Sequence, residues 1–183
     1  MALPGDPLDH VKASVMGKLL LGVLATVFLV LGLMAVGLST SIIGGGQPST
    51  QAQRDIPAAY LPLYQAAADS CPGLPWSVLA AIGKVESNHG RSTAPGVTSG
   101  ANFAGAAGPM QIGIGGKAGN TFGSYAVDAD GGGADVYSPP DAVFTAANYL
   151  CRNGAAQGRD VAKAVFAYNH ADWYVSQVLA IAS

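Results

Sequence analysis

From Leu19 the chain runs for more than thirty residues without a charged side chain, until Arg54. A helix needs about 20 apolar residues to cross a bilayer, so this run predicts a transmembrane helix over residues 19–43. A cleaved signal peptide is the competing interpretation. Its apolar core is usually shorter and ends in an Ala-x-Ala-like site, which does not follow here, so an uncleaved anchor is favoured.

The anchor divides the rest of the chain. Residues 1–18 form a polar leader with Lys12 and Lys18, which we expect to be cytosolic. Residues 44–55 are small and polar and predict a flexible linker. Residues 56–183 remain for one domain on the outer side of the cell membrane.

Charge and acidic composition narrow the function. The nine Lys and Arg residues are scattered and the net charge is −2, so a nucleic-acid binder is not expected. All acidic residues are Asp except one, Glu86.

The domain reads as all-α or nearly so, with no strong strand signal. Pro75 can begin a helix that Asn88 and Gly90 end, and Asp160 can cap another. Residues 90–133 are Gly-rich and predict loops, with one short helix near Met110. The expected helices cover residues 57–69, 75–87, 139–152, 161–168 and a last one from Asp172.

Glu86 lies on the same predicted helix face as Leu79 and Ile82. A carboxyl at the end of an apolar stripe has its pKa raised by desolvation, as a general acid near neutral pH requires. The alternative is that Glu86 pairs with Lys84 or Arg91, or faces water.

Three short motifs occur in order along the chain. They are Glu86-Ser87 followed by Gly90, then Gly105 to Ile112 with Met110-Gln111, then Ala167-Tyr168-Asn169-His170. In these motifs the chain resembles the lytic transglycosylases of the lysozyme-like superfamily, over about residues 57–183. The resemblance implies a helical domain of the goose-type lysozyme or SLT kind.

The resemblance also implies roles for the motif residues. Glu86 would protonate the glycosidic oxygen between N-acetylmuramic acid and N-acetylglucosamine, then take a proton from the 6-hydroxyl to give a 1,6-anhydro product. Ser87 would orient the reaction centre, Met110 would form an apolar wall, and Tyr168 would hydrogen-bond near the carboxyl. Gln111 and Asn169 would contact the substrate.

Each supporting residue has a simpler interpretation. Met110 can fill the core, and Tyr168 and Asn169 can end a helix. Peptidoglycan strands and the membrane are the expected partners, with no cofactor.

The single Glu favours a lytic transglycosylase, because ordinary glycosidases use two carboxylates. Two alternatives stay open. One is a muramidase that hydrolyses the same bond, and the other is a catalytically silent wall-binding module of a conjugation or secretion complex.

After Gln111 the chain departs from the family pattern and becomes longer and richer in glycine. We predict that residues 113–133 form a mobile rim of the glycan cleft. Phe122 and Tyr125 are the aromatics within this rim, and either stack on sugars or pack beneath the loop.

Cys71 and Cys151 both follow the apolar run, so export predicts a disulfide between them, with two separate buried thiols as the alternative. Asp128, Asp130 and Asp135 are reminiscent of a calcium loop. Gly132 and Pro139 stand at its fifth and twelfth positions, so an Asp/Gly turn is favoured. His89 and His170 lack a third ligand at a known zinc spacing, and we expect no metal.

Overall fold

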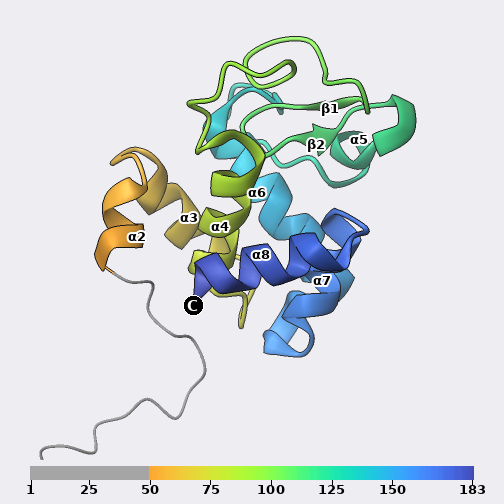
Figure 1. Ribbon diagram of the computed structural model, residues 1–183. Helices are drawn as coiled ribbons and strands as arrows, with labels where there is room; N and C mark the ends of the chain where they lie inside the picture. The colour runs from red at the N-terminus through yellow and green to blue at the C-terminus, as the bar shows by residue number, and fades with distance from the viewer. Residues whose placement is uncertain (1–49) are drawn as a thin grey trace, which may run out of the picture. The chain divides into compact units, whose positions relative to one another are not determined.

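The computed structural model describes residues 50–183 (Figure 1). The predicted leader 1–18 and transmembrane helix 19–43 lie outside the described residues. Among the helices that are described, none has the length and apolar character needed to span a bilayer. The predicted linker 44–55 lies only partly within the described residues, and its last six residues form helix α2 (Thr50–Asp55). Asp55 at its end forms ion pairs with Lys84 and Arg91.

The described residues are mostly helical, which confirms the predicted fold class. Local signals set several boundaries: Asn88 takes the left-handed conformation (φ 53°) and ends α4. The Asp160 side chain accepts a hydrogen bond from the backbone N–H of Lys163 at the start of α7. The main helices are α3 (Tyr60–Asp69), α4 (Trp76–Ser87), α6 (Pro139–Leu150), α7 (Val161–Tyr168) and α8 (Asp172–Ala182).

Smaller elements connect the helices. A π-helical turn, η2 (Cys151–Ala155), and a 3₁₀ turn, η3 (Ala156–Gly158), join α6 to α7. The segment between α4 and α6 carries η1 (Gly116–Ala118) and α5 (Thr121–Tyr125). It also carries a short antiparallel hairpin, β1 (Ala106–Ala107) with β2 (Ile112–Gly113), in which Ala106 lies opposite Gly113.

The short helix predicted near Met110 is wrong, because residues 108–111 form the turn of this hairpin. Gly108 (φ 75°) and Gln111 (φ 46°) both have left-handed backbones, which cannot continue a right-handed helix. The Gln111 backbone N–H instead donates to the Gly108 carbonyl and closes the turn.

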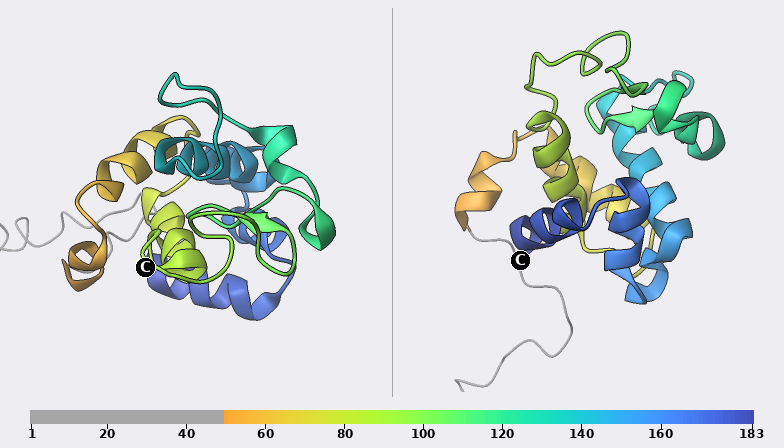
Figure 2. Two further views of the ribbon diagram at one scale, coloured as in Figure 1. Left: turned by 90° about the horizontal axis from the view of Figure 1, so that it is seen from above. Right: turned by 45° about the vertical axis from the view of Figure 1, so that its right-hand side comes forward.

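Helix α4 lies at the centre of the core, packed against α3 and α8, while α3 also packs against α6. It buries Val78, Leu79 and Ile82. Burying such side chains stabilises the fold by about 1.5–3 kcal/mol each. The hairpin and α5 lie on one side of α4 and α6, and α7 and α8 lie on the other (Figures 1 and 2). The C-terminal end of α4 therefore lies between these two groups of elements.

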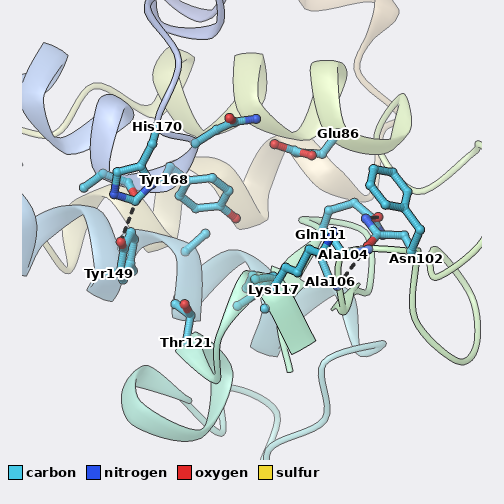
Figure 3. Close-up of a pocket in the computed structure, with 17 residues that line it drawn as sticks. Glu86, Asn102, Ala104, Ala106, Gln111, Lys117, Thr121, Tyr149, Tyr168 and His170 are labelled. Atoms are coloured by element: carbon cyan, nitrogen blue, oxygen red, sulfur yellow. Dashed lines mark hydrogen bonds between the residues drawn. The ribbon is translucent and has the colours of Figure 1, made fainter. Parts of the chain in front are cut away.

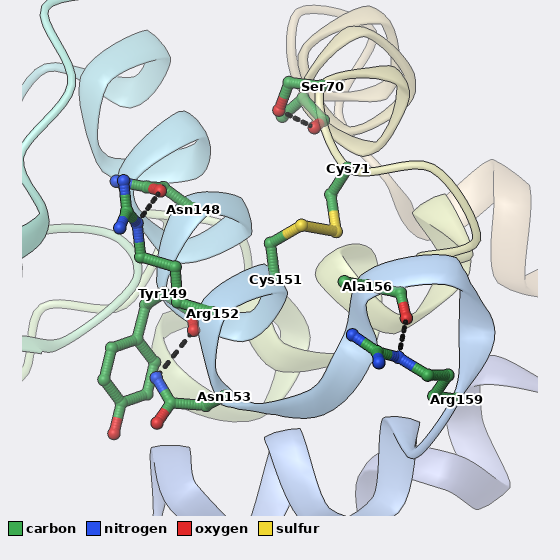
Figure 4. The surroundings of a disulfide bond; sticks show 10 residues. Ser70, Cys71, Asn148, Tyr149, Cys151, Arg152, Asn153, Ala156 and Arg159 are labelled. Atoms are coloured by element: carbon green, nitrogen blue, oxygen red, sulfur yellow. Dashed lines mark hydrogen bonds between the residues drawn. A yellow bond between two sulfur atoms is a disulfide. The ribbon is translucent and has the colours of Figure 1, made fainter.

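A disulfide joins Cys71, directly after α3, to Cys151, where α6 passes into the π-helical turn (Figure 4). The two Cα atoms are 5.7 Å apart, across a sequence separation of 80 residues. The predicted pairing is therefore confirmed, and it links the end of α3 to the end of α6.

Candidate active site

Glu86 lies in the last turn of α4 and lines a cleft of about 420 Å³. Figure 3 shows its carboxyl pointing into this space, with Tyr168 beyond it and Thr121 and Tyr149 on the opposite side. Gln111, Tyr168 and Asn169 line the same cleft, so the fold brings together side chains from all three sequence motifs.

Glu86 forms no ion pair with the two cations that the sequence offered as partners, because Lys84 and Arg91 both pair with Asp55. Its partner is Tyr174 of α8, whose hydroxyl donates a hydrogen bond to Glu86 Oε1 at 2.6 Å. Burial raises the pKa of Glu86 to about 7, and the Tyr174 hydrogen bond opposes this by stabilising the carboxylate. The carboxyl therefore holds a proton through the slightly acidic range and can release it near neutrality.

Tyr174 was not predicted from the sequence, although a signal for it exists. Tyr174, Val178 and Ala182 follow one another at four-residue intervals and are all buried, so they form the inner face of α8. A tyrosine on a buried face needs a partner for its hydroxyl. Burial and the nearby Glu86 raise the pKa of Tyr174 far above its ordinary value, so the phenol stays protonated and donates.

The hairpin turn connects the motifs through its backbone carbonyls. The hydroxyl of Ser87, which follows Glu86 in α4, donates to the Pro109 carbonyl and also accepts from the Gly90 N–H at 2.7 Å. The hydroxyl of Tyr168 donates to the next carbonyl, that of Met110, at 2.8 Å. Two successive carbonyls of one turn thus fix the end of α4 and the end of α7 around the cleft.

Three motif residues, Ser87, Met110 and Tyr168, have contacts that differ from their expected roles. The Met110 side chain is fully buried and packs in the core, so it supplies no wall of the cleft. Tyr168 lines the cleft but its hydroxyl is directed to the Met110 carbonyl, while Tyr174 takes the place beside the carboxyl. Ser87 is buried and acts through the backbone of the turn rather than through a direct contact in the cleft.

Gln111 is held from two sides. Its amide nitrogen donates to the Gly108 carbonyl at 2.9 Å, and its amide oxygen accepts from the Asn102 side chain at 3.0 Å. Asn102 also lines the cleft, as does Tyr149 on the far side, whose hydroxyl donates to the Ala167 carbonyl at 2.8 Å. Neither residue was singled out in the sequence, because neither lies in one of the three motifs.

The Gly-rich segment contributes four residues to the lining of the cleft: Gly113, Lys117, Ala118 and Thr121. Its two aromatics do not take part. Phe122 packs against the core, and the Tyr125 ring packs edge-on against Tyr149, with the ring centroids 4.9 Å apart. The packing interpretation of these rings is therefore the one that fits, and the mobility of the segment stays a prediction.

His89 and His170, the two histidines within the described residues, occupy different environments. His89 is buried, its Nδ1 is hydrogen-bonded to the Tyr64 hydroxyl at 2.9 Å, and burial lowers its pKa to about 4. Burial also raises the pKa of the neighbouring Tyr64, so its hydroxyl stays protonated. His170 lines the cleft and packs against Phe166.

Oxygen atoms of Asp128, Asp130 and Asp141 lie within 4.8 Å of one another, a spacing that a cation accepts. Backbone N–H groups already occupy these carboxylates. Those of Gly131 and Gly133 donate to Asp128, and those of Ala129 and Asp135 donate to the buried Asp141. These hydrogen bonds are typical of an Asp/Gly turn, and Asp141 rather than Asp135 lies beside Asp128 and Asp130.

The chain and its fold are similar to known proteins. Residues 64–182 match the family model of the transglycosylase SLT domain. No curated protein is found to match the chain. The fold is similar to that of the Escherichia coli lytic transglycosylase Slt35 in complex with bulgecin A, with a TM-score of 0.55 and 15% sequence identity over 77% of this chain and 79% of that one. The mostly helical, lysozyme-like fold is thus confirmed, and the chain belongs to the transglycosylase SLT domain family.

Proposed function

We propose that this chain is a peptidoglycan lytic transglycosylase that cleaves the β-1,4 bond between N-acetylmuramic acid and N-acetylglucosamine. The observation that carries the proposal is that Glu86, with its pKa raised to about 7, is the one carboxyl that lines the cleft within residues 50–183. Hydrolytic glycosidases place a second carboxylate across the scissile bond. A cleft with one carboxyl suits a reaction in which the substrate supplies its own nucleophile.

The chemistry then uses Glu86 twice, first as an acid and then as a base. Protonated Glu86 donates it to the glycosidic oxygen as the bond from that oxygen to C1 of N-acetylmuramic acid breaks, with the 2-acetamido group of that sugar stabilising C1. The Glu86 carboxylate next removes the proton of the 6-hydroxyl as O6 bonds to C1. The products are a 1,6-anhydro end and a free 4-hydroxyl, and Glu86 is left protonated for another turnover.

Product masses test this function against its alternatives. We expect digestion of isolated peptidoglycan to release fragments with anhydro ends. Fragments heavier by one water would identify a muramidase. Absence of any release by correctly folded protein would identify a silent wall-binding module of a conjugation or secretion complex.

We further propose that residues 19–43 anchor the enzyme in the cell membrane, with the leader 1–18 in the cytosol and the catalytic domain outside. The uncharged run after Lys18 supports this topology. Sequencing the N-terminus of the mature protein tests it. A mature chain that begins between residues 37 and 55 would mean a secreted enzyme instead.

Tyr174→Phe is expected to move the alkaline limb of the pH–rate profile to higher pH. Cleavage by a general acid is present below the pKa of Glu86, about 7, and is lost as the pH rises through it. The Tyr174 hydroxyl lowers this pKa, and phenylalanine removes the donor while keeping the ring.

Tyr64→Phe is the matched control, because it removes a buried hydroxyl that bonds to His89 rather than to Glu86. It should leave the alkaline midpoint in place. If Tyr174→Phe also left the midpoint unchanged, or moved it to lower pH, the assigned hydrogen bond would not govern the ionisation of Glu86.

A further inference from the structure

Phe103 is the most exposed large apolar side chain among the described residues, with 97% of its surface accessible. Its position is not arbitrary, because it lines the same cleft as Glu86. A phenylalanine ring held in water gains nothing for the fold, since burial of its apolar surface is the source of its stabilising effect. An aromatic ring in a glycan cleft can instead bury its face against a sugar.

The backbone beneath this ring is fixed without help from the ring. The side-chain oxygen of the preceding residue, Asn102, accepts from the N–H groups of Ala104 at 2.9 Å and Ala106 at 3.0 Å. The Asn102 N–H donates to the Ala106 carbonyl at 2.9 Å, and the Asn102 amide nitrogen donates to Gln111. The backbone of Phe103 is therefore fixed at the tip of a turn and has little freedom to lose on binding.

The next segment of the cleft wall braces the same turn. The Ala118 N–H donates to the Ala104 carbonyl at 2.7 Å, and the Ile114 N–H donates to the Gly105 carbonyl at 2.8 Å. Figure 3 shows Asn102 at one end of the cleft and Tyr149 and His170 at the other, with Glu86 between them. Phe103 follows Asn102, so it belongs to a substrate position beyond the reaction centre.

We propose that Phe103 is a glycan-binding residue whose ring stacks on the apolar face of an N-acetylated hexopyranose unit in the cleft, on the Asn102 side of Glu86. The inference rests on the proposed function, because it takes the ligand of the cleft to be a glycan strand. It assigns to Phe103 the stacking role that the sequence offered to Phe122 and Tyr125. The ring holds one sugar in place and takes no part in proton transfer.

The test uses the full chain and a soluble oligomer of N-acetylglucosamine, with the Glu86→Gln variant as the parent so that the ligand is not cleaved. Adding Phe103→Ala should weaken binding by roughly tenfold, as expected for loss of an aromatic burial contact. Phe103→Trp should restore the affinity. In the active background, Phe103→Ala should raise KM for peptidoglycan with little change in kcat, and the melting temperature should stay constant.

Trp173→Ala is the matched control, because Trp173 is also an exposed aromatic, at 63%, but does not line the cleft. It should leave oligosaccharide affinity unchanged. Equal affinities for the parent and its Phe103→Ala derivative would overturn the stacking role, while anhydro products from the wild type would still support the transglycosylase. A parent that binds no oligosaccharide, together with a wild type that releases no product, would overturn both proposals.

Discussion

Glu86→Gln is expected to reduce the rate of glycan cleavage by ~10²–10⁴-fold, the usual effect of removing a general acid. Glutamine keeps the size of the side chain, and its amide oxygen can still accept the hydrogen bond from Tyr174. What it lacks is a proton to give to the glycosidic oxygen. The rate of release of soluble fragments from peptidoglycan measures the effect, and a variant with more than a tenth of the wild-type turnover would exclude Glu86 as the acid.

The stability of the same variant shows whether it remains folded. The pKa shift of Glu86 also predicts at which pH the variant is more stable than the wild type. The pKa of Glu86 is about 7 in the folded protein, against 4.5 as its ordinary value, so the folded state holds the proton more tightly. The contribution of Glu86 to wild-type stability therefore falls as the pH rises from about 4.5 to 7, by roughly 3 kcal/mol. Glu86→Gln removes this loss and should be more stable than the wild type at pH 8, but not at pH 4. Urea unfolding at the two pH values measures the difference.

Removing the disulfide by Cys71→Ala with Cys151→Ala should lower the free energy of unfolding by about 4 kcal/mol, from the loop entropy of the 80-residue separation. For a domain of this size that corresponds to a fall in melting temperature on the order of 10 °C. Neither Cys71 nor Cys151 lines the cleft, so kcat at low temperature should change little.

Reduction of the wild type provides the matched control. Reductant should lower the melting temperature of the wild type toward that of the double variant, and leave the double variant unaffected. Mass mapping without reductant should recover Cys71 and Cys151 in one linked peptide pair. Two free thiols in exported protein would show that the bond does not form in the cell.

The helical part of the fold is predictable because its signals are local. Pro75, Asn88 and Asp160 mark helix ends through their own backbone and side-chain chemistry, and α4 and α7 begin or end beside them. The hairpin is not predictable in this way, since its strands have two residues each. Its existence depends on left-handed turn residues and on hydroxyl groups that arrive from α4 and α7.

The residues of the candidate site also fall into those that a local motif predicts and those that only the fold reveals. The motifs place Glu86, Gln111, Tyr168 and Asn169 in one cleft, where the fold does bring them together. The partner of Glu86 lies 88 residues further along the chain, so no spacing rule connects Tyr174 to it.

For Phe103 and Met110 the sequence does not predict which side chain is buried. One is apolar and exposed, the other apolar and buried, because the direction of a side chain in a tight turn is set by the backbone around it.

The glycines of the cleft wall have a consequence for how such an enzyme can evolve. A Cβ at Gly105 would lie 2.1 Å from the Gly115 carbonyl oxygen, and one at Gly108 would lie 1.9 Å from the Val136 carbonyl oxygen. One backbone rests directly on another at both places, and both glycines have positive φ. Mutation can therefore exchange the exposed side chains on this wall, such as Phe103 and Lys117, while the chain path that carries them is inherited unchanged. Substrate preference can therefore change by mutation while the backbone of the cleft wall stays the same.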